Sequence, residues 1–225
     1  MTAEAVLFDL DGTLYDRDRL VAALVGDQYD AFSDELVGVT RERYVAAVLA
    51  MDAHGHGEKS AGYPRVVGDL GLEPPLADRL LEHFWAHYDD YCELSEDTRL
   101  TLQTLRSRGI KLGVVTNGGA ERQRRKIAAL GLEPWFDAVL ISEAEGVRKP
   151  DAEIFRRALG RCGVAARAAV FVGDHPEADI EGARNAGLTA IWKAVPYWAA
   201  PADVPSVAQL TEILPICLGV ELDAG

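Results

Sequence analysis

The chain has 225 residues, of which 48% are hydrophobic and 26% are charged, and its formal net charge is −13. This size and composition predict a globular protein with a substantial core, built as one large domain or as a core with a modest insertion. The acidic balance disfavours nucleic acid and membrane surfaces as partners, because both are anionic. No apolar run is long enough to span a membrane, and the first residues lack the features of a signal peptide.

The three cysteines, Cys92, Cys162 and Cys217, are far apart in the sequence and odd in number. This spacing disfavours a disulfide framework and a Cys-x-x-Cys metal site. We therefore expect buried free thiols and a cytoplasmic protein. The sequence is compatible with either a monomer or a homodimer.

Five short apolar runs that end in turn-forming residues predict buried β-strands. They span residues 5–8, 110–115, 138–141, 168–172 and 189–192. Helical patterns alternate with the later strands, over residues 98–108, 120–130, 151–160 and 177–186. Strands that alternate with helices predict an α/β fold with a parallel sheet covered by helices on both faces.

The segment between the first two strands, about residues 14–94, contains no convincing strand. Its apolar residues have helical spacing over residues 18–36, 41–51 and 76–89, with Gly- and Pro-containing breaks between them. We therefore predict a core domain of residues 1–14 and 93–225 and an all-helical insertion of residues 15–92. The acidic tail, residues 218–225, is expected to fray.

Seven polar residues occupy the carboxyl ends of predicted strands or the loops nearby: Asp9, Asp11, Thr116, Asn117, Lys149, Asp174 and Asp179. Ligands of open parallel sheets bind outside the carboxyl ends of the strands, so these side chains are candidates for one site.

This set of residue types suits phosphoryl transfer. A carboxylate such as Asp9 can attack phosphorus if positive charge offsets its repulsion from the phosphate. Asp9 and Asp174 offer the hard oxygen ligands that Mg²⁺ prefers, while Lys149 supplies a second cation and Thr116 a hydroxyl donor. Asp11 can protonate the leaving alkoxide and later deprotonate water.

The same residues form motifs that resemble those of the haloacid dehalogenase-like hydrolase superfamily. Residues 8–14, Phe-Asp-Leu-Asp-Gly-Thr-Leu, resemble the first motif, and residues 115–118, Val-Thr-Asn-Gly, resemble the second. Lys149-Pro150 resembles the third motif, and residues 172–179, with Gly-Asp followed by a second Asp, resemble the fourth. The resemblance implies a Rossmann-like core and identifies the helical insertion with the cap domain of one large subgroup.

The resemblance also implies roles for the acidic residues. Asp9 is expected to be the nucleophile and a ligand of Mg²⁺. Asp11 is expected to be the general acid and base and to bind the metal through its backbone carbonyl. Asp174 is an expected metal ligand, and Asp179 is a direct or indirect one. Asp179 has an alternative role as a first-turn acid favoured by the helix dipole.

The remaining site residues are expected to hold the substrate. The resemblance places Thr116 on a phosphoryl oxygen, and it makes Lys149 the residue that orients Asp9 and screens charge. Asn117 is a candidate for substrate binding, with shaping of the turn as the alternative. The predicted activity is Mg²⁺-dependent hydrolysis of a small phosphorylated metabolite through an aspartyl-phosphate intermediate.

Three other functions compete with a phosphatase. A phosphomutase would return the phosphoryl group to a sugar, and the first motif does not exclude it. A 2-haloacid dehalogenase is disfavoured, because the dehalogenases of this superfamily lack an acid at the position of Asp11 and the Gly-Asp around Asp174. A non-enzymatic phospho-acceptor or phospho-ligand-binding protein is disfavoured, because receiver domains are much shorter and have no helical insertion.

Two further groups have structural alternatives. The loop with His54, His56 and Lys59 is expected to be solvated, with substrate contact as the alternative. A basic run is expected to form a solvated helix face, with an anion site as the alternative: Arg122, Arg124, Arg125 and Lys126. We assign no role to His175.

Overall fold

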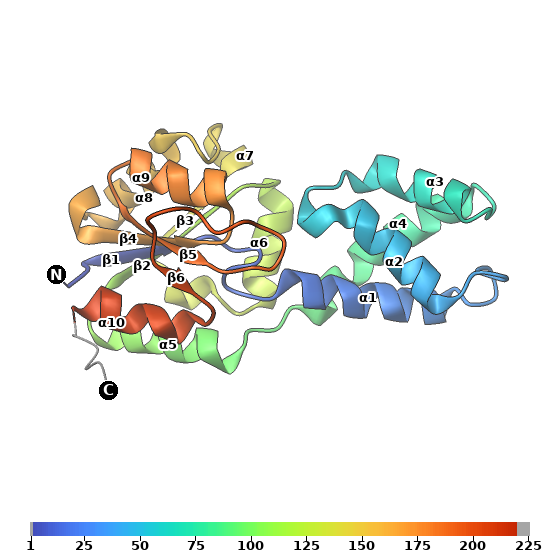
Figure 1. Cartoon of the computed structure of the whole chain (residues 1–225), viewed down its shortest axis with the longest axis horizontal. Helices are drawn as coiled ribbons and strands as arrows, with labels where there is room; N and C mark the ends of the chain where they lie inside the picture. The colour runs from blue at the N-terminus through green and yellow to red at the C-terminus, as the bar shows by residue number, and fades with distance from the viewer. Residues whose placement is uncertain (1, 220–225) are drawn as a thin grey trace. The chain divides into compact units, whose positions relative to one another are not determined.

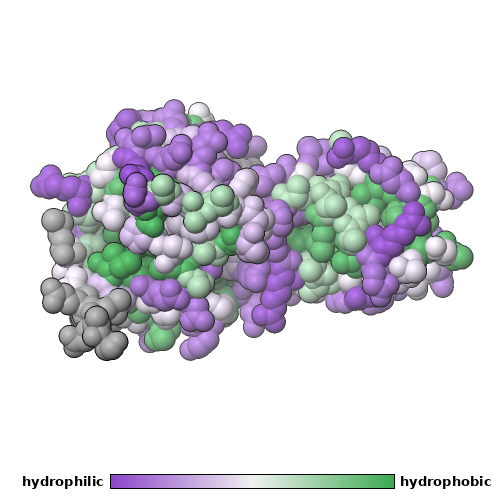
Figure 2. Space-filling model, viewed as in Figure 1, coloured by the Kyte–Doolittle hydropathy of each residue, from purple (hydrophilic) through white to green (hydrophobic). Residues whose placement is uncertain are grey.

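The computed structural model describes residues 2–219, so most of the predicted frayed tail lies outside the described residues. The chain folds into two compact units. Met1–Tyr15 and Glu93–Gly225 form one unit, here called the core unit, and Asp16–Cys92 form the other, here called the helical unit. In the visible face of each unit, hydrophilic residues are mixed with hydrophobic ones (Figure 2).

The core unit contains a six-stranded parallel sheet in the order β3-β2-β1-β4-β5-β6. The strands are β1 (Ala5–Phe8), β2 (Lys111–Thr116), β3 (Ala138–Ile141), β4 (Ala169–Gly173), β5 (Thr189–Lys193) and β6 (Ser206–Val207). All residues of β1 are fully buried, as expected for a central strand that is apolar on both faces. Phe8 pairs with Val114 of β2 on one side and with Val172 of β4 on the other, so the carboxyl ends of these three strands lie close together.

Helices cover both faces of this sheet. Figure 1 shows α5 and α10 on one face and α8 and α9 on the other. The helices of the core unit are α5 (Glu96–Ser107), α6 (Ala120–Ala129), α7 (Ser142–Glu145), α8 (Ala152–Cys162), α9 (Gly182–Asn185) and α10 (Ile213–Leu218). In α5, the Ser95 side chain caps the first turn by accepting from the Thr98 amide, and Leu102 and Leu105 bury the inner face.

The observed sheet confirms the predicted α/β fold class, and the five predicted strands are present within one residue at each end. The structure also differs from the prediction in several places, two of them next to the site. The sequence did not reveal β6, which has only two residues. The predicted helix over residues 177–186 begins as a π-helical turn, Pro176–Glu181, before α9.

The helical unit is built from four α-helices and two short 3₁₀ turns in its described residues: α1 (Arg17–Ala31), α2 (Arg41–Asp52), η1 (Ala53–Gly55), α3 (Lys59–Asp69), α4 (Leu76–His87) and η2 (Tyr88–Tyr91). A buried glutamine, Gln28, accepts hydrogen bonds from the hydroxyls of Tyr44 (2.6 Å) and Tyr63 (3.0 Å). Its amide donates to the Leu80 carbonyl at 2.7 Å, so this polar side chain is satisfied inside the unit. Among the described residues, no helix combines the length and apolar character that crossing a membrane requires.

Candidate active site

Asp9 lies immediately after β1, where the sheet ends. Its backbone amide donates to the Val172 carbonyl of β4 at 2.9 Å, which continues the strand pairing to the site. The side chain is buried, and Lys149 Nζ lies 2.6 Å from Asp9 Oδ1. Burial raises the pKa of Asp9 well above its usual range, Lys149 opposes this, and Asp179 and Asp174 add to it.

Lys149 bridges two carboxylates. Its Nζ lies 2.6 Å from Asp9 Oδ1 and 2.6 Å from Asp179 Oδ1. Burial alone would lower the pKa of Lys149, but the charges of Asp179 and Asp9 outweigh burial and raise it, so the ammonium stays protonated. The loop that carries Lys149 is held by Asn117, whose amide donates to the Lys149 carbonyl (3.0 Å) and whose carbonyl accepts from the Lys149 amide (2.9 Å).

Three buried carboxylates, Asp9, Asp174 and Asp179, converge at this end of the sheet. Each offers an oxygen, and these oxygens lie within 4.8 Å of one another. Burial and the charge of Asp179 raise the pKa of Asp174 to about 7, although Lys149 opposes them. Three carboxylates face one ammonium, so a divalent cation with a preference for hard oxygen ligands fits both the donor set and the charge. Mg²⁺ meets both requirements.

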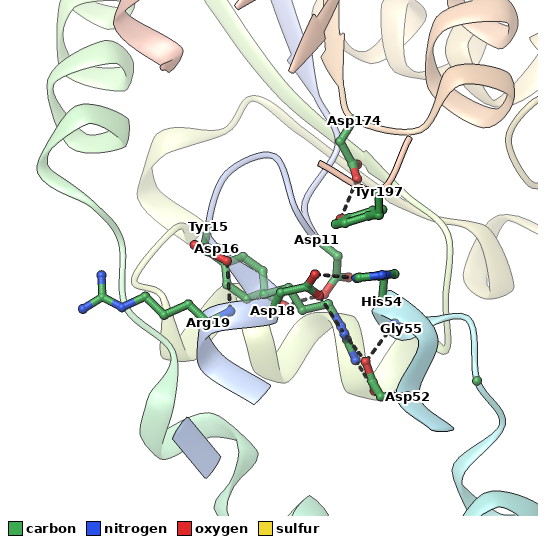
Figure 3. A network of polar contacts seen from close by, with 12 residues as sticks. Asp11, Tyr15, Asp16, Asp18, Arg19, Asp52, His54, Gly55, Asp174 and Tyr197 are labelled. Atoms are coloured by element: carbon green, nitrogen blue, oxygen red, sulfur yellow. Dashed lines mark hydrogen bonds and ion pairs between the residues drawn. The ribbon is translucent and has the colours of Figure 1, made fainter. Parts of the chain in front are cut away.

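The Asp174 carboxylate is held on several sides. The Thr13 hydroxyl donates to it at 3.5 Å and the Tyr197 hydroxyl at 3.3 Å, the latter visible in Figure 3. The Trp192 indole donates to the Asp174 carbonyl at 2.6 Å. Gly12, at φ +82°, faces the carboxylate so closely that a Cβ would stand 2.8 Å from Asp174 Oδ2.

The Asp11 side chain does not join the three-carboxylate cluster. It is bound instead by Lys126 Nζ at 2.7 Å, by Gln123 Nε2 at 2.8 Å and by the Tyr15 hydroxyl. Gln123 Nε2 also lies 2.6 Å from Thr116 Oγ1, so it connects two predicted site residues. The metal contact expected of Asp11 concerned its backbone carbonyl and stays a prediction.

Sequence reasoning missed Gln123 and Lys126. The prediction of a solvated basic face is wrong for Lys126, which is buried on α6, whereas its neighbours are exposed at Arg122, Arg124 and Arg125. Spacing could have revealed the difference, because residues 123 and 126 share a face with the buried Ile127 and Leu130.

The helical unit holds its own charged cluster. Arg17 Nη1 lies 2.7 Å from Asp52 Oδ2, and Lys59 Nζ lies 2.7 Å from Asp52 Oδ1. All three side chains are buried. The expectation of a solvated loop is therefore wrong for Lys59, because its ammonium pairs with a buried carboxylate. His54 is exposed and pairs through Nδ1 with Asp18 at 2.5 Å (Figure 3).

His175 acts as a local cap. Its Nδ1 accepts from the backbone amides of Glu177 (3.2 Å) and Ala178 (3.1 Å), where the π-helical turn begins. Its ring lies 4.7 Å from the Trp198 ring, centroid to centroid. The His175 amide donates to Asp179 Oδ2 at 3.0 Å, so this turn also orients one carboxylate of the cluster.

Comparisons with known proteins identify the family of the chain. A family model described as haloacid dehalogenase-like hydrolase matches residues 3–187. A glyceraldehyde 3-phosphate phosphatase of Methanopyrus kandleri is 34% identical over 198 residues, covering 84% of this chain and 82% of the relative. A phosphoserine phosphatase of Thermus thermophilus is 40% identical over 124 residues, covering 55% of this chain and 49% of the relative. The match therefore spans about half the length of that second relative.

Among solved structures, a 2-haloacid dehalogenase from Pseudomonas syringae superposes with a TM-score of 0.61 at 31% identity. The superposition covers 97% of this chain and 99% of that one. The chain is therefore similar both to proteins named as phosphatases and to a solved structure named as a dehalogenase, so the site residues must decide between the two chemistries.

Proposed function

Because the chain belongs to the haloacid dehalogenase-like hydrolase family, as its motifs predicted, we propose that it is a Mg²⁺-dependent phosphatase of a small phosphorylated metabolite. The relatives named as phosphatases support hydrolysis of a phosphoric monoester. The observation that carries the proposal is the buried Asp9 carboxylate, with Lys149 at 2.6 Å and two further carboxylates within metal-binding reach.

In the proposed reaction, a carboxylate oxygen of Asp9 attacks phosphorus and the bond to the ester oxygen breaks, which leaves an aspartyl phosphate. Asp11 gives a proton to the departing oxygen and later takes one from the water that attacks phosphorus and releases Asp9. Lys149 and the Thr116 hydroxyl offset charge on the phosphoryl oxygens.

Asp9, Asp174 and Asp179 are the side chains we propose to hold the metal, directly or through water, together with the Asp11 carbonyl. When bound, Mg²⁺ would offset the repulsion between the Asp9 carboxylate and the phosphate dianion. We propose a positioning role for Asn117, which holds the loop of Lys149 through two hydrogen bonds.

We further propose that the helical unit is the cap domain and selects the substrate, with His54 and His56 as the residues that contact it. The three cysteines, all within the described residues, are not joined in disulfides, which supports a reducing compartment such as the cytoplasm. The net charge of −13 supports a small-molecule substrate over nucleic acid or anionic membrane as partner.

The second candidate function is 2-haloacid dehalogenation, favoured by the 31% identical dehalogenase structure. Displacing halide from carbon needs neither a proton for the leaving group nor a metal. Asp11 and the carboxylate cluster around Asp174 would then have no role in the reaction, so we favour the phosphatase. Chloride release from a 2-haloacid, or an isomeric sugar phosphate as product, would identify the dehalogenase or a phosphomutase instead.

Hydrolysis of p-nitrophenyl phosphate, measured with Mg²⁺ and after chelation, tests the proposal. We expect activity only with the metal, and a loss of at least about 10³-fold in Asp9→Asn, which is nearly isosteric but a poor nucleophile. Asp203→Asn, at an exposed position of the same unit, is the matched control and should retain parental activity. The proposal would be wrong if the parent had no activity with Mg²⁺, or if Asp9→Asn were as active as an active parent.

A further inference from the structure

Helix α6 directs two buried polar side chains, Gln123 and Lys126, at the Asp11 carboxylate. Gln123 is 3% exposed and Lys126 is 9% exposed. The two residues are three positions apart and therefore share one face of the helix. Neither belongs to the four motifs that carry the family resemblance.

Their contacts occupy both oxygens of the carboxylate. Lys126 Nζ lies 2.7 Å from Asp11 Oδ1, which also accepts a hydrogen bond from the Tyr15 hydroxyl. Gln123 Nε2 lies 2.8 Å from Asp11 Oδ2 and 2.6 Å from Thr116 Oγ1. Donors on both oxygens fix the plane of the carboxyl group, and Gln123 ties that plane to the hydroxyl proposed to hold the phosphoryl group.

The loop after β2 is shaped to admit Gln123. Gly118 has a φ of +149°, and a Cβ there would stand 3.1 Å from both Cγ and Cδ of Gln123. A side chain at residue 118 would therefore press on Gln123. The glycine leaves the space that the buried Gln123 side chain occupies.

We propose that Gln123 and Lys126 are positioning residues that hold Asp11 in the geometry for proton transfer. The inference rests on the proposed phosphatase function and names the groups that prepare its general acid and base. Proton transfer depends steeply on the placement of the donor, so loss of either contact should weaken catalysis through Asp11 and not through substrate binding. No additional reactant is needed, because the proton that Asp11 gives to the ester oxygen is replaced from water.

The test compares two esters of similar size whose leaving groups differ in their need for a proton. Phenolate is a far stronger base than p-nitrophenolate, so only phenyl phosphate depends strongly on a general acid at neutral pH. We expect Lys126→Met and Gln123→Met to lower kcat/KM, which reports the step that forms the aspartyl phosphate, about tenfold more for phenyl phosphate than for p-nitrophenyl phosphate. Arg124→Met, an exposed position of the same helix, should leave both rates unchanged.

A double-mutant cycle gives a second, independent readout. In an Asp11→Asn background, Lys126→Met should cause little additional loss, because the group that it positions is already disabled. Thermal denaturation of each variant identifies misfolding. If Lys126→Met does not fold, the same comparison is made with Gln123→Met.

Equal losses of kcat/KM on both esters, or losses that multiply in the double variant, would overturn the inference. The phosphatase function would then still stand, because the parent enzyme hydrolyses both esters. A parent that hydrolyses neither ester in the presence of Mg²⁺ would overturn the proposed function and this inference together.

Discussion

Lys149 Nζ lies 2.6 Å from Asp9 Oδ1, although 140 positions separate the two residues in the sequence. The same ammonium reaches Asp179 at the same distance, and all three side chains are buried. Burial raises the pKa of Asp9, and the charge of this ammonium opposes that effect.

Replacing Lys149 by Met should lower kcat by about 10²–10³-fold, because a preorganised cation at the reacting centre is lost. Lys149 lowers the pKa of Asp9 against the effect of burial, so its removal should raise that pKa further. The acid limb of the pH–rate profile is therefore expected to move to higher pH. Arg148→Met, at the exposed neighbouring position, is the control, and an unmoved acid limb would contradict the electrostatic role.

The Asp174→Asn variant should bind Mg²⁺ more weakly and yet be more stable without metal at pH 8. Burial and Asp179 raise the pKa of Asp174 to about 7, so at pH 8 the metal-free parent holds an ionised, poorly compensated carboxylate. Calorimetric Mg²⁺ titration and metal-free thermal denaturation check the two parts. Glu177→Gln, exposed on the same segment, should match the parent, and parental Mg²⁺ affinity in Asp174→Asn would exclude Asp174 as a ligand.

Gly173→Ala should impair activity through shape alone. A Cβ at residue 173 would stand 2.5 Å from Cγ of Asp179, so this carboxylate would have to leave Lys149. Gly160→Ala is the matched control, because nothing lies within 4 Å of its Cβ and residue 160 is inside helix α8. The control should gain about 0.5–1 kcal/mol of stability and keep its activity. Normal kinetics in Gly173→Ala would show that Asp179 need not occupy its observed place.

Asp52→Asn should destabilise the helical unit by about 3–5 kcal/mol at pH 7, because Arg17 and Lys59 would remain buried without their counter-charge. Burial alone would raise the pKa of Asp52, but Arg17 and Lys59 outweigh it and lower the pKa to about 2. The unfolded carboxyl titrates at about 3.9. The stability that Asp52 contributes is therefore complete above pH 4 and is lost as the pH falls toward 2.

Hydrogen exchange of the amides in residues 16–92, measured for parent and variant between pH 7 and pH 3, checks this prediction once the intrinsic exchange rates are corrected for pH. The difference in protection should shrink as the pH falls below about 4. Asp30→Asn removes an exposed partner of Arg41 and should change stability by less than about 0.5 kcal/mol. A parent–variant difference that is constant with pH would contradict the assigned charge pairing.

His54→Ala and His56→Ala should change the ranking of phosphorylated metabolites while sparing p-nitrophenyl phosphate. The expectation follows from their proposed place on a substrate-selecting unit. Lys59→Met should differ from both, because Lys59 is paired with Asp52 and should act on stability. A substrate panel combined with melting temperatures separates the two behaviours, and an unchanged ranking in the histidine variants would remove them from substrate selection.

The sequence predicted those parts of the fold that rest on contiguous patterns. Strand β1 is an apolar run that ends at Asp9, and β4 is one that ends at Gly173. Strand β6 has two residues and no periodicity to detect. Helix α3 was hidden because it contains Gly62 and Pro64, which normally indicate a break.

The candidate site was predictable where it depends on motifs and hidden where it depends on packing. The carboxyl ends of neighbouring parallel strands bring Asp9 and Asp174 together, which topology alone predicts. Gln123 and Lys126 belong to a helix whose apolar spacing indicates the inward face, but no pattern in the sequence indicates that these two side chains contact Asp11. The pairing of Lys59 with Asp52 likewise depends on how α2 and α3 pack.

Strand β1 has a kinetic consequence for folding, because both its neighbours come late in the sequence. Ala5 pairs with Lys111 and Ala169, so the centre of the sheet closes only after the whole helical unit has been synthesised. Such long-range pairings slow folding, since chain entropy must be lost before the contacts form. Within the helical unit, the Tyr91 hydroxyl donates to Asp27 at 2.6 Å, which joins its first helix to its last turn. Early folding of residues 16–92 would therefore shorten the loop that β1 must close.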